Sequence, residues 1–177
     1  MTKSALILHA WHNGPDKHWS PWLKKELETK GYTVYLPEIP TMETDAPDLK
    51  SQMDFIEKTV PLADDFIVFG HSLGSLLAMR LAEKHKFRKL FLVSGWDFDD
   101  LTVEHQSFWK TKMNHNAIRK NVKDIYVTSS DNDPYMTAFT MEAMSKRFGA
   151  TYIFVKGAGH FTESSGYAKI PQLLPYI

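Results

Sequence analysis

The feature that most constrains the fold of this chain is a regular alternation between short apolar runs and amphipathic segments. The runs with the length and composition of strands lie at residues 5–9, 33–36, 65–69, 89–93, 124–128 and 151–155. Short apolar runs separated by helical patterns are typical of a parallel sheet covered by helices. We therefore expect an α/β fold with a mainly parallel six-stranded sheet, helices on both faces, and a single domain over residues 1–177.

The expected helices are the amphipathic segments at residues 19–30, 48–60, 75–85, 138–148 and 166–176. The stretch from residue 95 to residue 121 does not fit the alternation. It is long for a loop, and its aromatic residues, Trp96, Phe98, Phe108 and Trp109, show no clean period. This stretch predicts either a lid or pocket wall beside a site, or a packing element that covers the sheet.

Composition excludes several classes of partner. Lysine plus arginine and aspartate plus glutamate number 21 each, so no global charge favours nucleic acid or an anionic membrane. The absence of cysteine excludes a disulfide partner, a thiolate metal site and a cysteine nucleophile, and it is compatible with a reducing cytosol. The apolar run at residues 5–8 is too short for a signal-peptide core, and no later run is long enough to span a bilayer. We expect a cytoplasmic protein that does not enter membranes.

The strongest functional motif is Gly-His-Ser-Leu-Gly at residues 70–74, between a predicted strand and a predicted helix. A chain that reverses from strand to helix within a few residues forces the central serine into a strained conformation, with its hydroxyl exposed. Glycines on either side leave room for the close packing of this turn. The motif therefore indicates Ser72 as a nucleophile.

A serine hydroxyl needs a neighbouring base, which in turn needs an orienting carboxylate. His160 follows the last predicted strand within Lys-Gly-Ala-Gly-His-Phe, and the carboxyl ends of parallel strands share one edge of a sheet. The loop after the preceding strand offers Asp131 and Asp133 at the same edge. The order serine, acid, histidine is the one expected of a serine hydrolase with this architecture.

We prefer Asp133 to Asp131 as the acid, because Pro134 fixes the backbone after Asp133, whereas Asp131 could act locally in a turn. A relocated acid remains an alternative among the aspartates that follow the strand after the nucleophile, Asp97, Asp99 and Asp100. The simpler interpretation of these three is a solvated, helix-capping cluster.

Acyl transfer also requires hydrogen-bond donors for the developing oxyanion. The backbone N–H of Leu73, at the start of the predicted helix, is the first candidate, and that of Trp11, after the first strand, is the second. Structural roles in turns or aromatic packing are expected for His9, His12, His18 and His71. No His-x-x-x-His pair with a supporting acid occurs, so we expect no metal.

These motifs together resemble the small α/β-hydrolases of the YdeN and retinoblastoma-binding serine hydrolase type. The resemblance rests on the serine motif, on Ser-Asp-Asn-Asp-Pro at residues 130–134, and on Gly-His-Phe at residues 159–161. It extends to His-Trp-Ser-Pro-Trp-Leu at residues 18–23 and to Leu-Pro at residues 36–37, and so covers nearly the whole chain. It implies a compact fold without a large cap domain and a triad of Ser72, Asp133 and His160.

Two departures from that family are visible. The oxyanion loop commonly starts with His-Gly, whereas this chain has His9-Ala10, which affects the geometry near Trp11. The Leu-x-Cys-x-Glu motif of the retinoblastoma-binding member cannot exist in a chain without cysteine, so that partner is not expected here.

The sequence thus predicts a serine hydrolase that cleaves a small ester, thioester or activated amide through an acyl-enzyme on Ser72, without a cofactor. We expect Trp96, Phe98 and Trp109 to form part of an apolar substrate pocket. The alternative is a catalytically silent protein that keeps the fold and binds a partner.

Overall fold

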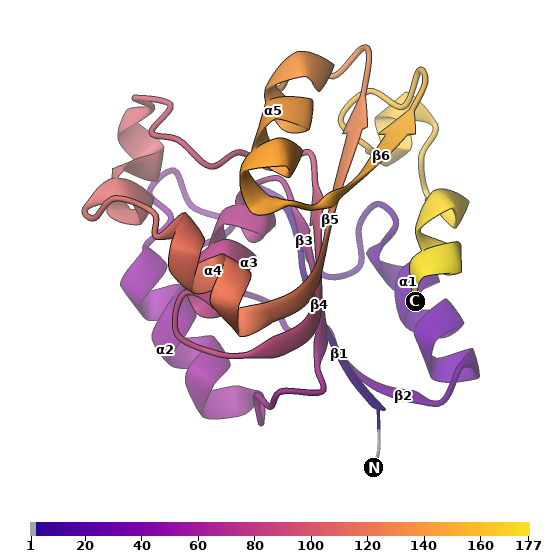
Figure 1. Ribbon diagram of the computed structural model, residues 1–177, viewed down its shortest axis with the longest axis horizontal. Helices are drawn as coiled ribbons and strands as arrows, with labels where there is room; N and C mark the ends of the chain where they lie inside the picture. The colour runs from indigo at the N-terminus through magenta and orange to yellow at the C-terminus, as the bar shows by residue number, and fades with distance from the viewer. Residues whose placement is uncertain (1–2) are drawn as a thin grey trace.

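The computed structural model describes residues 3–177, and its centre is a six-stranded sheet (Figure 1). The strands are β1 (Lys3–Leu8), β2 (Tyr32–Tyr35), β3 (Ile67–His71), β4 (Phe87–Val93), β5 (Val122–Ser130) and β6 (Thr151–Val155). Their order is β2-β1-β3-β4-β5-β6, and every neighbouring pair is parallel. This confirms the expected fold class. The strand order reverses between β1 and β3, and in such sheets ligands bind in the crevice beyond the carboxyl ends of the strands at this point.

Helices cover both faces of the sheet (Figure 1). One face carries α2 (Leu49–Thr59), α3 (Leu73–Ala82), α4 (His115–Asn121) and α5 (Ala138–Phe148). The other carries α1 (Ser20–Thr29) and the carboxyl-terminal segment. Successive strand residues serve opposite faces: Leu6 and Leu8 belong to the first core, and Ala5 and Ile7 to the second. Each strand of the sheet's centre is buried on both sides for this reason.

Local signals define several helix ends. The Asp48 side chain accepts a hydrogen bond from the backbone N–H of Ser51 (2.8 Å) and caps α2. Thr137 caps α5 in the same way, and Gly149 ends that helix in the left-handed conformation, with φ of 64°. None of the helices formed by residues 3–177 has both the length and the apolar character needed to cross a membrane.

Two differences from the sequence prediction are larger than small shifts of element ends or bear on the site. Strand β3 continues to His71, because its ladder with β4 extends to the pair His71–Val93, and α3 begins at Leu73. Only Ser72 therefore separates strand from helix. The expected helix at 166–176 does not form: this stretch contains one short 3-10 helix, Pro171–Tyr176, and a second, Glu163–Ser165, precedes it. Gly166 (φ of 81°) and the two prolines within Pro171–Tyr176 prevent a continuous α-helix.

Residues 95–121 combine both roles that the sequence left open. This segment contains a 3-10 helix, Val103–Trp109, and then α4. Phe108 is fully buried in the core against the helices of the first face, which is a packing role. The Arg80 guanidinium on α3 donates to the backbone carbonyls of Phe108 and Thr111, the latter at 2.6 Å, and so ties the segment to this helix. Other residues of the segment line a cavity.

Candidate active site

Ser72 is held in a strained conformation at the turn between β3 and α3. Its φ of 53° and ψ of −121° are rare for a residue with a side chain. Its N–H donates to the carbonyl of Val93 on β4 (2.9 Å), and its carbonyl accepts from the N–H of Ser75 (2.8 Å). The surrounding backbone therefore enforces the strain. Strained backbone that is fixed in this way is characteristic of functional sites.

Close packing explains why glycines flank this turn. A Cβ placed on Gly70 would lie 2.5 Å from Ser75 Cα, and one placed on Gly74 would lie 2.3 Å from the carbonyl oxygen of Leu8. Both contacts are with backbone, which cannot move aside. The two glycines are thus required because strand β1, the turn and α3 approach one another so closely, rather than because of an unusual φ at either glycine.

His160 and Asp133 form a hydrogen-bonded pair. His160 Nδ1 lies 2.9 Å from Asp133 Oδ2 and 3.0 Å from Oδ1. The Asp133 carboxylate, whose side chain is 1% exposed, also accepts from Ser94 Oγ (2.7 Å) and from the N–H of Tyr135 (2.9 Å). Burial alone would raise the pKa of Asp133, but the hydrogen bonds from His160, Ser94 and Tyr135 outweigh it and lower that pKa. Asp133 is therefore an ionised acceptor for His160 Nδ1–H.

The loop that carries His160 is bound to the loop after β5 through its backbone. Three successive N–H groups, those of Gly157, Ala158 and Gly159, donate to side chains at residues 130–132, with distances of 2.6, 2.8 and 2.7 Å. The acceptor for Gly157 is Asp131 Oδ1. Asp131 thus anchors the loop of the imidazole, while Asp133 contacts the imidazole itself.

The hydrogen-bond partners of Asp97 are not His160 but residues on α4 and α5. Its buried carboxylate accepts from Arg147 on α5 (Nε to Oδ2, 2.8 Å) and contacts His115 Nε2 on α4 (2.8 Å). Both hydrogen bonding to Asp97 and its charge raise the pKa of Arg147. The interpretation of Asp97 as part of a solvated capping cluster is wrong, because it is a buried link between the loop and two helices. Asp99 does accept a local backbone N–H, from Leu101 (2.9 Å).

A cavity of about 730 Å³ opens beside Ser72 at the carboxyl edge of the sheet. Ser72 and His160 both line it, as do Leu73 and Trp11, the residues expected to supply oxyanion donors. Trp96 lines it too. The structure thus brings together residues that lie far apart in the sequence.

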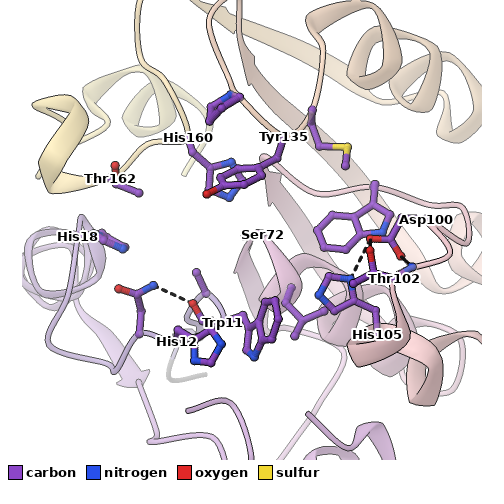
Figure 2. A pocket seen from close by; sticks show the side chains of 16 residues that line it. Trp11, His12, His18, Ser72, Asp100, Thr102, His105, Tyr135, His160 and Thr162 are labelled. Atoms are coloured by element: carbon purple, nitrogen blue, oxygen red, sulfur yellow. Dashed lines mark hydrogen bonds and ion pairs between the residues drawn. The ribbon is translucent and has the colours of Figure 1, made fainter. Parts of the chain in front are cut away.

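Figure 2 shows the cavity with Ser72 near its middle. His18 and Thr162 lie on one side of Ser72, while Asp100 and His105 lie on the other. The His105 ring, which contacts Asp100 Oδ2 through Nδ1 (2.8 Å), stands edge-on to the Trp11 indole, with ring centroids 5.0 Å apart. One side of the cavity is therefore a wall of aromatic rings that includes a carboxylate–imidazole pair.

Two of the expected pocket residues lie elsewhere. Phe98 is 41% exposed and is not among the residues that line the cavity. Trp109 is also outside the lining: the Arg80 guanidinium lies over its ring, 5.6 Å from the centroid, and the ring packs against the core. Tyr135, Met136 and Thr102 line the cavity but were not predicted from the sequence. Tyr135 and Met136 directly follow Asp133-Pro134, which is the signal that could have found them.

The loop after β1 is held in place by side chains and backbone. Trp11 Nε1 donates to the carbonyl of Thr44 (2.8 Å), Asn13 Nδ2 donates to the carbonyl of Trp11 (2.8 Å), and the N–H of His12 donates to Met42. His9 accepts at Nε2 from the N–H of Ile39 (3.1 Å), and burial lowers the pKa of His9, which keeps it neutral. Ala10 is therefore part of an ordered loop.

Metal ligation finds no support in the described part of the chain. Residues 3–177 contain no group of three or more histidine, aspartate or glutamate side chains placed to hold a metal ion.

Comparison with known proteins identifies the family and the fold. The family model described as "Serine hydrolase" matches residues 5–177. Serine hydrolase RBBP9 of Rattus norvegicus is 26% identical over 146 residues, which is 81% of this chain and 77% of that protein. The structure of the ydeN gene product from B. subtilis superposes with a TM-score of 0.86 at 25% identity, covering 99% of this chain and 96% of that one.

A hydrolase of the α/β superfamily from Xanthomonas campestris shares the fold, with a TM-score of 0.70 at 18% identity and 99% of each chain covered. The resemblance seen in the sequence motifs is confirmed by these matches. Because the family model covers almost the whole chain, this protein belongs to the serine hydrolase family.

Proposed function

We propose that this enzyme hydrolyses a small ester, thioester or activated amide through an acyl-enzyme on Ser72, with His160 as the base and Asp133 as its orienting acid. One observation carries the proposal. The His160–Asp133 pair and the strained Ser72 turn, which come from three different loops, meet at a single cavity.

The hydrogen-bond pattern assigns the proton positions. Asp133 is acceptor-only when ionised, so His160 Nδ1 carries the hydrogen of the 2.9 Å bond and Nε2 of the neutral ring has a free lone pair. Nε2 removes the proton of the Ser72 hydroxyl as its oxygen bonds to the substrate carbonyl carbon. The negative charge moves to the carbonyl oxygen, which the N–H groups of Leu73 and Trp11 stabilise.

Collapse of this intermediate breaks the bond to the leaving group, which takes the proton from His160 Nε2. Water then repeats the sequence: His160 removes its proton, the hydroxide oxygen bonds to the acyl carbon, and Ser72 leaves with the proton. The enzyme is regenerated and a carboxylic acid is released. No cofactor takes part in these steps.

From the same geometry we infer which part of the substrate occupies each side of the cavity. The leaving group must lie next to His160, because it receives that proton, so it occupies the side with His18 and Thr162. The acyl group then extends toward Trp96 and the aromatic wall. We expect apolar acyl groups to be preferred, with a preference that rises with acyl length until the cavity is full.

Covalent labelling by a fluorophosphonate probe tests the proposal. The wild-type enzyme should be labelled on Ser72, as located by mass spectrometry, and it should hydrolyse p-nitrophenyl esters. Ser72→Ala should lose both properties with an unchanged melting temperature, whereas Ser51→Ala, at an exposed serine on α2, should keep both. Labelling on another serine would refute the assignment, and the absence of labelling and hydrolysis would favour the silent binding protein.

A further inference from the structure

His71 is the residue immediately before Ser72, and its side chain is enclosed by aromatic rings. It ends strand β3 and is 1% exposed. Its ring lies 5.4 Å from Trp19, 5.6 Å from His18 and 5.4 Å from His160, measured between ring centroids. The reaction steps above make no use of this buried imidazole.

One hydrogen bond joins His71 directly to the loop of His160. His71 Nε2 lies 2.8 Å from the backbone carbonyl oxygen of His160. A carbonyl oxygen only accepts, so Nε2 carries the hydrogen. Burial, together with the neighbouring His160, lowers the pKa of His71 to about 3. His71 therefore donates this bond as a neutral ring and places no positive charge beside His160.

This bond differs in kind from the other anchors of the loop. The N–H groups of residues 157–159 are held by side chains at 130–132, and the His160 ring is held by Asp133. All those partners belong to the end of β5 and to the loop that follows it. They hold His160 directly against its acid, but none of them is a direct bond to β3, the strand that ends at Ser72. His71 instead ties the His160 backbone to the strand that ends at Ser72.

We propose that His71 is a positioning residue whose hydrogen bond to the His160 carbonyl sets the placement of the imidazole relative to the Ser72 hydroxyl. The inference rests on the proposed function, because only a reacting pair needs this placement. Errors of about 1 Å between reacting groups cost on the order of a hundredfold in rate. His71 is not among the residues that line the cavity, so we expect its contribution to fall on kcat rather than on KM.

Two substitutions separate the donor from the packing. His71→Phe keeps an aromatic ring against Trp19 but removes the donor, and His71→Gln removes the ring but offers an amide N–H at similar reach. We expect kcat for a p-nitrophenyl ester to fall about ten- to hundredfold in the Phe variant, with KM within about threefold of wild type. The Gln variant should recover most of the lost kcat even where its melting temperature is the lower of the two.

The matched control is His85→Phe, because His85 also pairs with a neighbour, Glu57 (2.9 Å), but lies outside the cavity lining. It should leave kcat and KM unchanged. If kcat instead follows melting temperature, with Phe active and Gln inactive, His71 acts only through packing and the proposal is overturned. Equal kcat in wild type and both variants overturns it as well. A wild-type enzyme that neither hydrolyses esters nor reacts at Ser72 refutes the proposed function, and the positioning role with it.

Discussion

Acidification from pH 7 to pH 5 should destabilise the wild-type protein through His71 by about 2 kcal/mol. The imidazole is buried without charge, and its pKa falls from 6.5 in the unfolded chain to about 3 in the fold. Between these values the unfolded state binds a proton and the folded state does not. The contribution of the uncharged His71 to the free energy of unfolding is therefore fully present above pH 6.5 and is lost progressively as the pH falls toward 3.

The magnitude follows from the difference between the two pKa values. Each pH unit below 6.5 costs about 1.4 kcal/mol while the folded state stays unprotonated, so 1.5 units give about 2 kcal/mol at pH 5. Among the groups that face His71, burial also lowers the pKa of His18, which acts in the same direction. The pKa of Asp133 is lowered from 3.8, so this carboxylate stays ionised over the range.

Urea unfolding at pH 7 and pH 5 measures the effect, and comparison with His71→Gln isolates it. The wild-type free energy of unfolding should fall by about 2 kcal/mol more than that of the variant, because His18 titrates in both proteins. An equal pH dependence in the two proteins would show that His71 is protonated normally in the fold, contrary to its buried, uncharged state.

Three further outcomes are expected. Asp133→Asn should reduce kcat by about 10⁴-fold with little change in folding. Asp97→Asn should instead lower the free energy of unfolding by about 2 kcal/mol in urea titrations and leave relative ester rates unchanged. The reverse pattern would identify Asp97 as the acid. Trp96→Ala should flatten the preference for longer acyl groups, to which burial contributes about 0.8 kcal/mol per methylene, as a series of kcat/KM values would show. Gly74→Ala should destabilise by about 3 kcal/mol or more, because the added Cβ meets the Leu8 carbonyl oxygen at 2.3 Å; a normal denaturation midpoint would contradict this.

Topology explains what could be predicted from the sequence. Strand-forming runs and the rule that parallel strands end at one edge were enough to expect that the loops of Ser72, Asp133 and His160 would meet. The structure places Ser72 and His160 at one cavity and bonds Asp133 to His160. These positions depend on local patterns and chain order, both of which the sequence displays.

The remainder depends on contacts between distant residues. Arg147, the ion-pair partner of the buried Asp97, lies 50 positions away in the chain, and no local pattern connects the two. Phe98 and Trp109 could not be assigned to a face, because a segment built from loop and 3-10 helix has no regular period to show which side is inward. His71 gave no sign of its role, since its acceptor is a backbone carbonyl 89 positions away.

The position of β6 at the edge of the sheet has a consequence for how the enzyme loses activity on heating. In the sheet formed by residues 3–177, β6 pairs with β5 alone, and the loop of His160 follows it directly. An edge strand is hydrogen-bonded to one neighbouring strand only, so it opens locally at lower free energy than the central strands. Warming should therefore move the loop of His160 away from the Ser72 turn while most helices persist. Inactivation would then precede global unfolding and would reverse on cooling, since the rest of the fold remains as a template for β6 to dock again.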